Sequence, residues 1–194
     1  MNSPDILQGL NPAQHDAVIH RGGPLLVVAG AGSGKTRVLT QRIAHLIQED
    51  NINPFQILAI TFTNKAAQEM KDRVAALVGP VAEKMWVSTF HSACVRILRR
   101  DAEQLGYPSA FSIYDQADAT RLTGYVVRDL GLDNKKFVAR SVHAQISNLK
   151  NELISTDAAL DRADGIFGRK IAEIYDEYQR RLRSAGAMDF DDLL

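Results

Sequence analysis

The first part of the chain alternates between short apolar runs and longer segments whose apolar side chains recur at helical spacing. The apolar runs cover residues 25–28, 57–62 and 85–89, and they predict three buried strands. Helical spacing follows each run, over residues 36–48, 66–77 and 92–100. This alternation is typical of a parallel sheet with helices on both faces, so we predict an α/β fold.

From residue 115 onward, the pattern is helical, with almost no strand signal. Predicted helices cover residues 117–130, 142–153 and 167–182. We expect residues 1–110 to begin the sheet domain, residues 111–186 to form an inserted all-helical subdomain, and residues 187–194 to start the return. Asp189 would cap a helix with barely one turn before Leu194. We interpret this ending as a truncation before the sheet is complete.

The composition is that of an ordinary globular protein, with 45% hydrophobic and 24% charged residues. Basic and acidic residues balance at 23 each, so any DNA contact must come from local patches. Cys94 is the only cysteine, which excludes a disulfide framework and indicates a reducing compartment. No apolar run approaches the length of a membrane span, and the first residues do not resemble a signal peptide. We therefore expect a cytoplasmic protein without a membrane partner.

Residues 29–36 read Ala-Gly-Ala-Gly-Ser-Gly-Lys-Thr, between a predicted strand and a predicted helix. In such a phosphate cradle, glycines let backbone N–H groups point at an anion, and the helix N-terminus adds positive charge. Lys35 can reach the β- and γ-phosphates, and Thr36 can place its hydroxyl on Mg²⁺. The strict pattern has glycine where this chain has Ala29. The expected nucleotide contacts here are Ala29, Gly30, Ala31, Gly32, Ser33, Gly34, Lys35 and Thr36.

ATP hydrolysis also requires an acidic residue at the end of a second buried strand, where it holds Mg²⁺ and orients water. Asp115 ends a short apolar run, but Ser112 interrupts that run. Asp191 and Asp192 follow a segment, residues 185–187, that is not predicted as a strand. We assign neither candidate, and no arginine finger, so the chain is expected to hold half of an ATPase site.

Together with the cradle, four segments resemble the amino-terminal part of the UvrD/PcrA/Rep helicases of superfamily one. The segments are Leu10–Gln14, Ala59–Ala67, Val87–Ser92 and Asp189–Leu194. The resemblance covers essentially the whole chain and implies a P-loop RecA-like ATP-binding domain, with ATP and Mg²⁺ as cofactors. It also implies that the family's Asp-Glu magnesium motif, second RecA-like domain and arginine finger lie downstream of Leu194.

The resemblance further implies that Gln14 reads the adenine base and that Arg37 stacks on the adenine ring. A glutamine amide can donate and accept at once, and a planar guanidinium stacks well. From the residues alone, an exposed glutamine near a helix start is the commoner role for Gln14, and a solvated helix residue is the alternative for Arg37. Lys35 and Thr36 keep their catalytic roles at the phosphates, and Thr36 is the metal ligand.

The candidate DNA contacts follow the second and third predicted strands, at the sheet edge where ligands bind in parallel folds. They are Thr61, Phe62, Thr63, Asn64, Thr89, Phe90 and His91. Core packing is the commoner fate of phenylalanine. The resemblance favours base stacking for Phe62, whereas Phe90 stays open between the two roles. The arginines at 180, 181 and 183 and the lysines at 135 and 136 are weaker candidates for phosphate contacts.

We therefore expect the amino-terminal part of an ATP-dependent 3′–5′ DNA helicase that acts in DNA repair or replication. Its expected partners are single-stranded DNA, single/double-strand junctions and repair proteins. We expect residues 1–194 alone to bind nucleotide and DNA without hydrolysing ATP. The alternatives are a P-loop kinase or GTPase, and a non-catalytic nucleotide-binding regulator. A GTPase would need a guanine-reading Asn-Lys-x-Asp, and residues 64–67 lack its aspartate.

Overall fold

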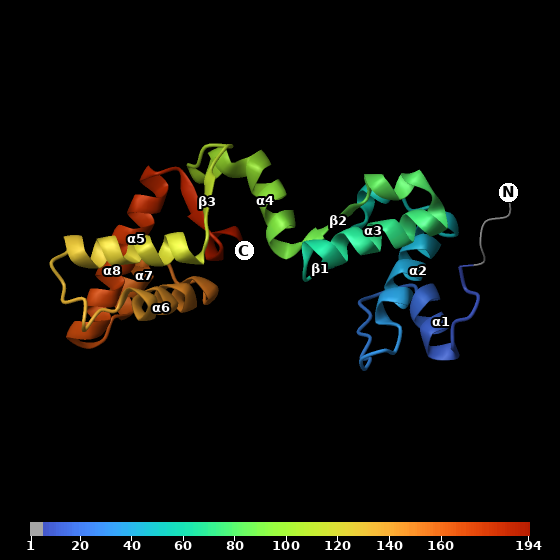
Figure 1. Cartoon of the computed structure of the whole chain (residues 1–194), viewed down its shortest axis with the longest axis horizontal. Helices are drawn as coiled ribbons and strands as arrows, with labels where there is room; N and C mark the ends of the chain where they lie inside the picture. Colours follow the sequence, from blue (N-terminus) through green and yellow to red (C-terminus); the bar gives the residue numbers. More distant parts are fainter. Residues whose placement is uncertain (1–5) are drawn as a thin grey trace. The chain divides into compact units, whose positions relative to one another are not determined.

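The computed structural model describes residues 6–194 (Figure 1). The chain divides into two compact units, one that runs to Ala93 and one that runs from Cys94 to Leu194. Both units combine helices with short parallel strands, so the predicted mixed α/β class is confirmed. None of the helices within residues 6–194 has the length and apolar character that crossing a bilayer requires.

The first unit packs two helices against a two-stranded parallel sheet. Its elements are α1 (Pro12–Ile19), α2 (Lys35–Gln48), η1 (Pro54–Gln56), β1 (Leu58–Thr61), α3 (Asn64–Val78), η2 (Pro80–Lys84) and β2 (Trp86–Thr89). The register of β1 and β2 pairs Leu58 with Trp86 and Thr61 with Thr89. The core between the sheet, α2 and α3 includes Ile43, Ala59, Met70, Val74 and Val87. The strands predicted near residues 57–62 and 85–89 and the helices that precede and follow β1 are confirmed.

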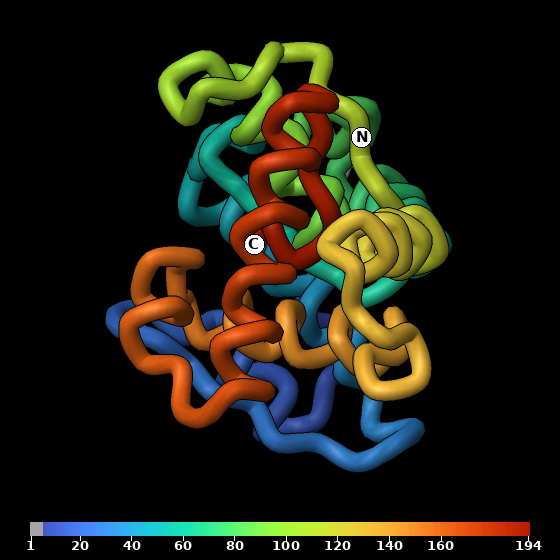
Figure 2. Tube along the Cα trace, turned by 90° about the vertical axis from the view of Figure 1, so that its left-hand side faces the viewer, coloured from blue at the N-terminus to red at the C-terminus, as the bar shows by residue number. Residues whose placement is uncertain are grey.

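The second unit is mainly helical and begins within α4 (Phe90–Asp101). Its further elements are η3 (Ala102–Leu105), β3 (Ser112–Tyr114), α5 (Gln116–Asp129), α6 (Ala139–Asn151), α7 (Thr156–Arg162), α8 (Gly165–Ser184), β4 (Ala187–Asp189) and η4 (Asp191–Leu193). The long α8 packs against α5, α6 and α7 (Figures 1 and 2). Val126, Ile146, Ile174, Tyr178 and Leu182 are completely buried in this core. The apolar stripe predicted for α8 is therefore confirmed.

The strand predicted at residues 25–28 is wrong within the described part of the chain, where this segment has no regular structure. Leu26 is 86% exposed and Val28 is 90% exposed. A strand requires a hydrogen-bonded neighbour, and β1 and β2 pair with each other instead. An apolar run therefore indicates a tendency to be buried, but it does not supply the pairing partner.

The sequence pattern showed almost no strand signal after residue 115, and it missed the strand β4 at Ala187–Asp189. This buried strand pairs in parallel with β3, in a register that joins Ser112 to Ala187 and Tyr114 to Asp189. Three residues are too few to show a period of two, so the local pattern could not reveal it. The compact units divide between Ala93 and Cys94. That division concerns packing, and the insertion expected at residues 111–186 stays a prediction.

Candidate nucleotide and DNA site

The phosphate cradle, residues 29–36, is a glycine turn that leads directly into the first turn of α2. Gly32 and Gly34 have left-handed φ values of 74° and 84°, which only glycine adopts without strain. The Ser33 hydroxyl donates to the Gly30 carbonyl at 2.7 Å and closes the turn. Gly34 caps α2 without a side-chain hydrogen bond. The first N–H groups of α2 therefore lack a side-chain acceptor, as an anion-binding helix start requires.

Lys35 lies over this turn rather than extending away from it. Its ammonium nitrogen is 3.0 Å from the Ala29 carbonyl and 2.6 Å from the Gly30 carbonyl. The side chain is exposed, and so is Thr36 beside it in the first turn of α2. A phosphate that binds the Lys35 ammonium would therefore replace one of these carbonyls as its hydrogen-bond partner.

The structure brings Gln14 to the cradle, although the two are far apart in the sequence. Gln14 Nε2 donates to the Ser33 carbonyl at 3.0 Å. Its Oε1 accepts from the Asn11 N–H at 3.0 Å, and Asn11 Oδ1 accepts from the Gln14 N–H at 2.9 Å. This reciprocal pair is a capping box at the start of α1. A Cβ at Gly34 would lie 2.9 Å from Gln14 Nε2. Gln14 therefore both caps α1 and supports the cradle.

Arg37, the second residue expected at the adenine, is exposed on α2 and donates to the Gln8 carbonyl at 2.9 Å. A cavity of about 350 Å³ lies beside the cradle, a volume within the range of small-molecule sites. It is lined by Asn11, Ala13, Gln14, Ala17, Val27, Val28, Ala29, Gly30, Ser33, Lys35 and Val38. The cavity thus joins an apolar wall to the ammonium and amide groups that the sequence singles out.

The candidate DNA contacts gather where β1 and β2 end. Because Thr61 is paired with Thr89, the residues that follow them, Phe62 and Phe90, leave the sheet at the same edge. Phe62 is 98% exposed and Phe90 is 64% exposed. Core packing of Phe62 is therefore excluded within this unit, and an exposed aromatic pair stands at the sheet edge.

The threonines of this edge hold the loops in place. Thr63 Oγ1 accepts from the Ala66 N–H and caps α3, and Thr61 Oγ1 donates to the Thr63 carbonyl. Thr89 Oγ1 accepts from the Ser92 N–H in the first turn of α4. Asn64 and His91 are exposed in the first turns of these helices. The rings and the helix starts are therefore accessible at this edge, and the threonine hydroxyls form hydrogen bonds within the loops.

In the second unit, the arginine cluster of α8 and Asp115, both singled out in the sequence, have structural roles. Arg180 and Arg181 bond the carboxylate of Glu177, and Arg181 also bonds Asp129. These hydrogen bonds, Arg180 first, lower the pKa of Glu177 to about 2. Asp115 caps α5 by accepting from two backbone N–H groups at 2.8 Å. The arginines are therefore held by internal ion pairs, and one Asp115 oxygen is occupied by the helix.

A buried charge network, which the sequence pattern did not predict, surrounds Asp189. Lys150 Nζ lies 2.7 Å from Asp189 Oδ2 and 2.8 Å from Asp192 Oδ1. Tyr178 donates its hydroxyl to Asp189 Oδ2 at 2.7 Å. Asp189 ends strand β4, so the prediction that no strand leads into this acidic cluster is wrong. Its oxygens are nevertheless bonded to Lys150, Tyr178 and the Asp192 N–H.

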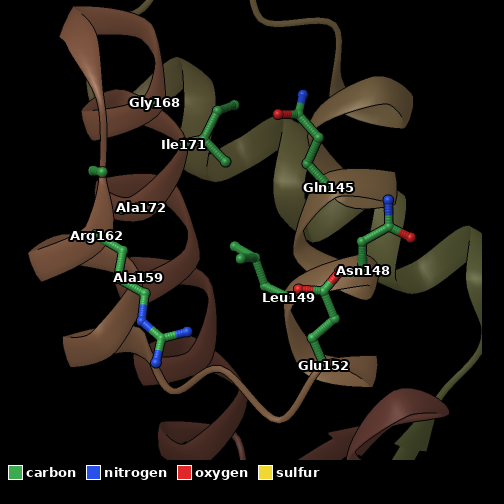
Figure 3. A pocket seen from close by; sticks show the side chains of 10 residues that line it. Gln145, Asn148, Leu149, Glu152, Ala159, Arg162, Gly168, Ile171 and Ala172 are labelled. Atoms are coloured by element: carbon green, nitrogen blue, oxygen red, sulfur yellow. The ribbon is translucent and has the colours of Figure 1, made fainter.

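A second cavity, of about 290 Å³, lies among α6, α7 and α8 (Figure 3). Leu149, Ala159 and Ile171 line its apolar part, and Glu152 and Arg162 lie at its edges. No glycine turn or helix start of the cradle type lines it. The candidate nucleotide site therefore remains the cavity beside the cradle.

Residues 10–194 match the family model described as UvrD/REP helicase N-terminal domain. The ATP-dependent DNA helicase UvrD1 of Mycobacterium tuberculosis is 58% identical over 194 residues, which is 97% of this chain and 25% of the relative. The ATP-dependent DNA helicase PcrA of Bacillus subtilis is 50% identical over 192 residues, which is 99% of this chain and 26% of the relative. The chain thus spans about a quarter of the length of these curated relatives. Because the family model covers nearly the whole chain, this chain belongs to the UvrD/REP helicase N-terminal domain family.

Proposed function

We propose that this chain is the nucleotide-binding and DNA-contacting part of an ATP-dependent 3′–5′ DNA helicase that acts in DNA repair or replication. The observation that carries the proposal is the cradle at the start of α2, with Gln14 bonded to its Ser33 carbonyl. The names of the relatives, ATP-dependent DNA helicases, support the same reading. In this proposal, residues 1–110 and 187–194 belong to a P-loop RecA-like domain that further residues complete, and residues 111–186 are inserted in it.

The residues of the cradle fit an ATP–Mg²⁺ complex. The exposed Lys35 ammonium suits the β- and γ-phosphates, and the exposed Thr36 hydroxyl suits Mg²⁺. Gln14 and Arg37 would meet the adenine base from α1 and α2. Bound Mg²⁺ would neutralise charge that develops on the phosphates. The described residues hold no group of three or more His, Cys, Asp or Glu side chains that could hold a metal ion. In this proposal, the carboxylate for Mg²⁺ comes from the acidic magnesium motif that the family resemblance implies.

On the DNA side, Phe62 is the proposed stacking platform for a base. Asn64, His91 and the starts of α3 and α4 suit phosphate groups. The proposed partners are single-stranded DNA and its junctions with duplex, together with repair proteins, in the cytoplasm. No observation favours a kinase, a GTPase or a non-catalytic regulator.

The test of this proposal is that the 194-residue chain binds ATP but does not turn it over. Titration with a fluorescent ATP analogue should give saturable binding, which Lys35→Ala weakens about tenfold or more, because a charge-assisted contact is lost. Phosphate release should stay absent with and without single-stranded DNA, since this proposal assigns none of residues 1–194 as the acidic group or the arginine finger that act in the transition state. Lys84→Ala, a change at another exposed lysine, is the matched control.

Absence of ATP binding by the parent chain would contradict the proposal. DNA-stimulated phosphate release that disappears in Lys35→Ala would show instead that the chain contains the missing acidic residue. Asp115, which directly follows β3, would then be the first candidate.

A second prediction concerns the base. Gln14→Ala should weaken ATP binding by roughly 1–3 kcal/mol, the cost of losing a specific polar pair, and should weaken GTP binding less. Competition titrations with both nucleotides measure the ratio. Gln14→Glu is a second variant that should also lose the ATP preference, because it keeps an acceptor for the Asn11 N–H but has no donor for the Ser33 carbonyl or the base. Equal losses for ATP and GTP in Gln14→Ala would mean that Gln14 only supports α1 and the cradle.

A further inference from the structure

The C-terminal end of α1 meets a guanidinium group that α2 supplies. Arg42 Nη1 lies 3.0 Å from the Ala17 carbonyl, 3.2 Å from the Val18 carbonyl and 2.9 Å from the His20 carbonyl. These carbonyls belong to the last turn of α1 and its C-cap, which a helix leaves without intrahelical partners. Within residues 6–194, Arg42 forms no ion pair with an acidic side chain. Its bonding partners are therefore the carbonyls of α1.

Helix α1 depends on such help. It has eight residues, no basic residue in its last turn, and only Ala17 and Val18 buried. A helix of this length is marginal without tertiary contacts. A cation at its C-terminus satisfies the free carbonyls and complements the helix dipole. The position of α1 is thus set at one end by the capping box of Asn11 and Gln14, and at the other end by Arg42.

Both ends of α1 are tied to the segment that carries the phosphate cradle. Gln14, in the first turn of α1, bonds the Ser33 carbonyl, and Arg42 stands two helical turns after Lys35 on α2. If the C-terminal carbonyls of α1 were released, the helix could fray or tilt. Gln14 would then lose its place beside the cradle, although no residue in contact with the nucleotide had changed.

We propose that Arg42 is a positioning residue that sets the preference for ATP over GTP by holding α1, and with it Gln14, against the cradle. This inference rests on the proposed reading of adenine by Gln14. All three contacts come from Arg42 Nη1. A lysine ammonium also offers several donors from one nitrogen, so it can replace much of this hydrogen bonding. Methionine keeps an apolar stem and removes both the charge and the donors.

The experiment compares dissociation constants of fluorescent ATP and GTP analogues for the parent chain, Arg42→Met and Arg42→Lys. Arg42→Met should raise the constant for ATP about tenfold and that for GTP by no more than about twofold. Arg42→Lys should restore most of the ATP preference. Arg42→Met added to Gln14→Ala should cause no further loss of preference, because both act through one contact. The control is Arg73→Met. Arg73 is exposed on α3 and forms no ion pair within the described residues.

Amide hydrogen exchange supplies the structural readout. In Arg42→Met, exchange should accelerate in residues 12–19 and stay unchanged in α3. If α3 also loses protection, Arg42→Gln, which keeps a neutral donor, replaces Arg42→Met in the comparison. An ATP preference that survives in Arg42→Met, or in Arg42→Gln where that variant replaces it, but is lost in Gln14→Ala would overturn the inference. A parent chain that binds ATP and GTP equally would instead remove the proposed adenine reading itself.

Discussion

The Lys150→Met variant is expected to lose about 3–5 kcal/mol of stability in the second unit, the cost of removing one partner from a buried ion pair. The side chains of Lys150, Asp189 and Asp192 are only 5%, 2% and 15% exposed. Methionine would keep the apolar stem but leave two buried carboxylates without their cation. Such charges cannot recover the hydration that they gave up on folding.

Within this network, the charges of Lys150 and Asp189 stabilise each other. Burial alone would raise the pKa of Asp189, but the Lys150 ammonium and its hydrogen bond outweigh burial, and the pKa is lowered. Burial alone would lower the pKa of Lys150, but the two carboxylates outweigh burial, and the pKa is raised. Both groups therefore stay charged near neutral pH, which is why removal of the cation is costly.

Urea unfolding can follow the two units separately. The only tryptophan, Trp86, lies in the first unit, and all five tyrosines lie in the second unit. Lys150→Met should move the tyrosine transition to lower urea and leave the Trp86 transition in place. Lys170→Met is the matched control, because Lys170 and Glu173 form a pair in which both side chains are 38% exposed. Such a pair contributes about 0–1 kcal/mol. Equal tyrosine midpoints for the two variants would contradict the assigned role of the buried network.

The second large effect is expected at Phe62. A base stacked on an aromatic ring is worth about 1–3 kcal/mol, so Phe62→Ala should weaken single-stranded DNA binding about tenfold or more. A buried phenylalanine would instead cost about 3–5 kcal/mol of stability on truncation. Because Phe62 is 98% exposed, the melting temperature should change little. Fluorescence anisotropy with an oligothymidine measures the binding.

Phe55→Ala is the matched control, because Phe55 is 69% exposed but lies in η1, before the start of β1. DNA affinity should be unchanged in this variant. In Phe62→Ala, ATP affinity without DNA and the dependence of DNA binding on salt should also hold, since stacking neutralises no phosphate. A marked drop in melting temperature with intact DNA affinity would assign Phe62 to packing. The DNA path would then rest on Thr63, Asn64 and His91.

Contiguous residues were enough to predict most of the helices and the cradle. Helices α2, α3, α5 and α8 are 14 to 20 residues long, so their apolar spacing repeats over several turns and can be recognised locally. The left-handed φ values of Gly32 and Gly34 are likewise a local requirement, which glycine at those positions satisfies. The identities of Lys35 and Thr36 at the start of a helix follow from the same few residues.

Strand pairing and long-range polar contacts could not be predicted from contiguous residues. Residues 25–28 are more apolar than β4, yet only β4 forms a strand, because Ser112–Tyr114 provides its partner. The bonds from Gln14 to Ser33, from Arg42 to α1 and from Lys150 to Asp189 each join residues that are distant in the sequence. A local period reports which face of an element is apolar. It does not report which distant group comes within hydrogen-bond distance, because that depends on how the elements pack against one another.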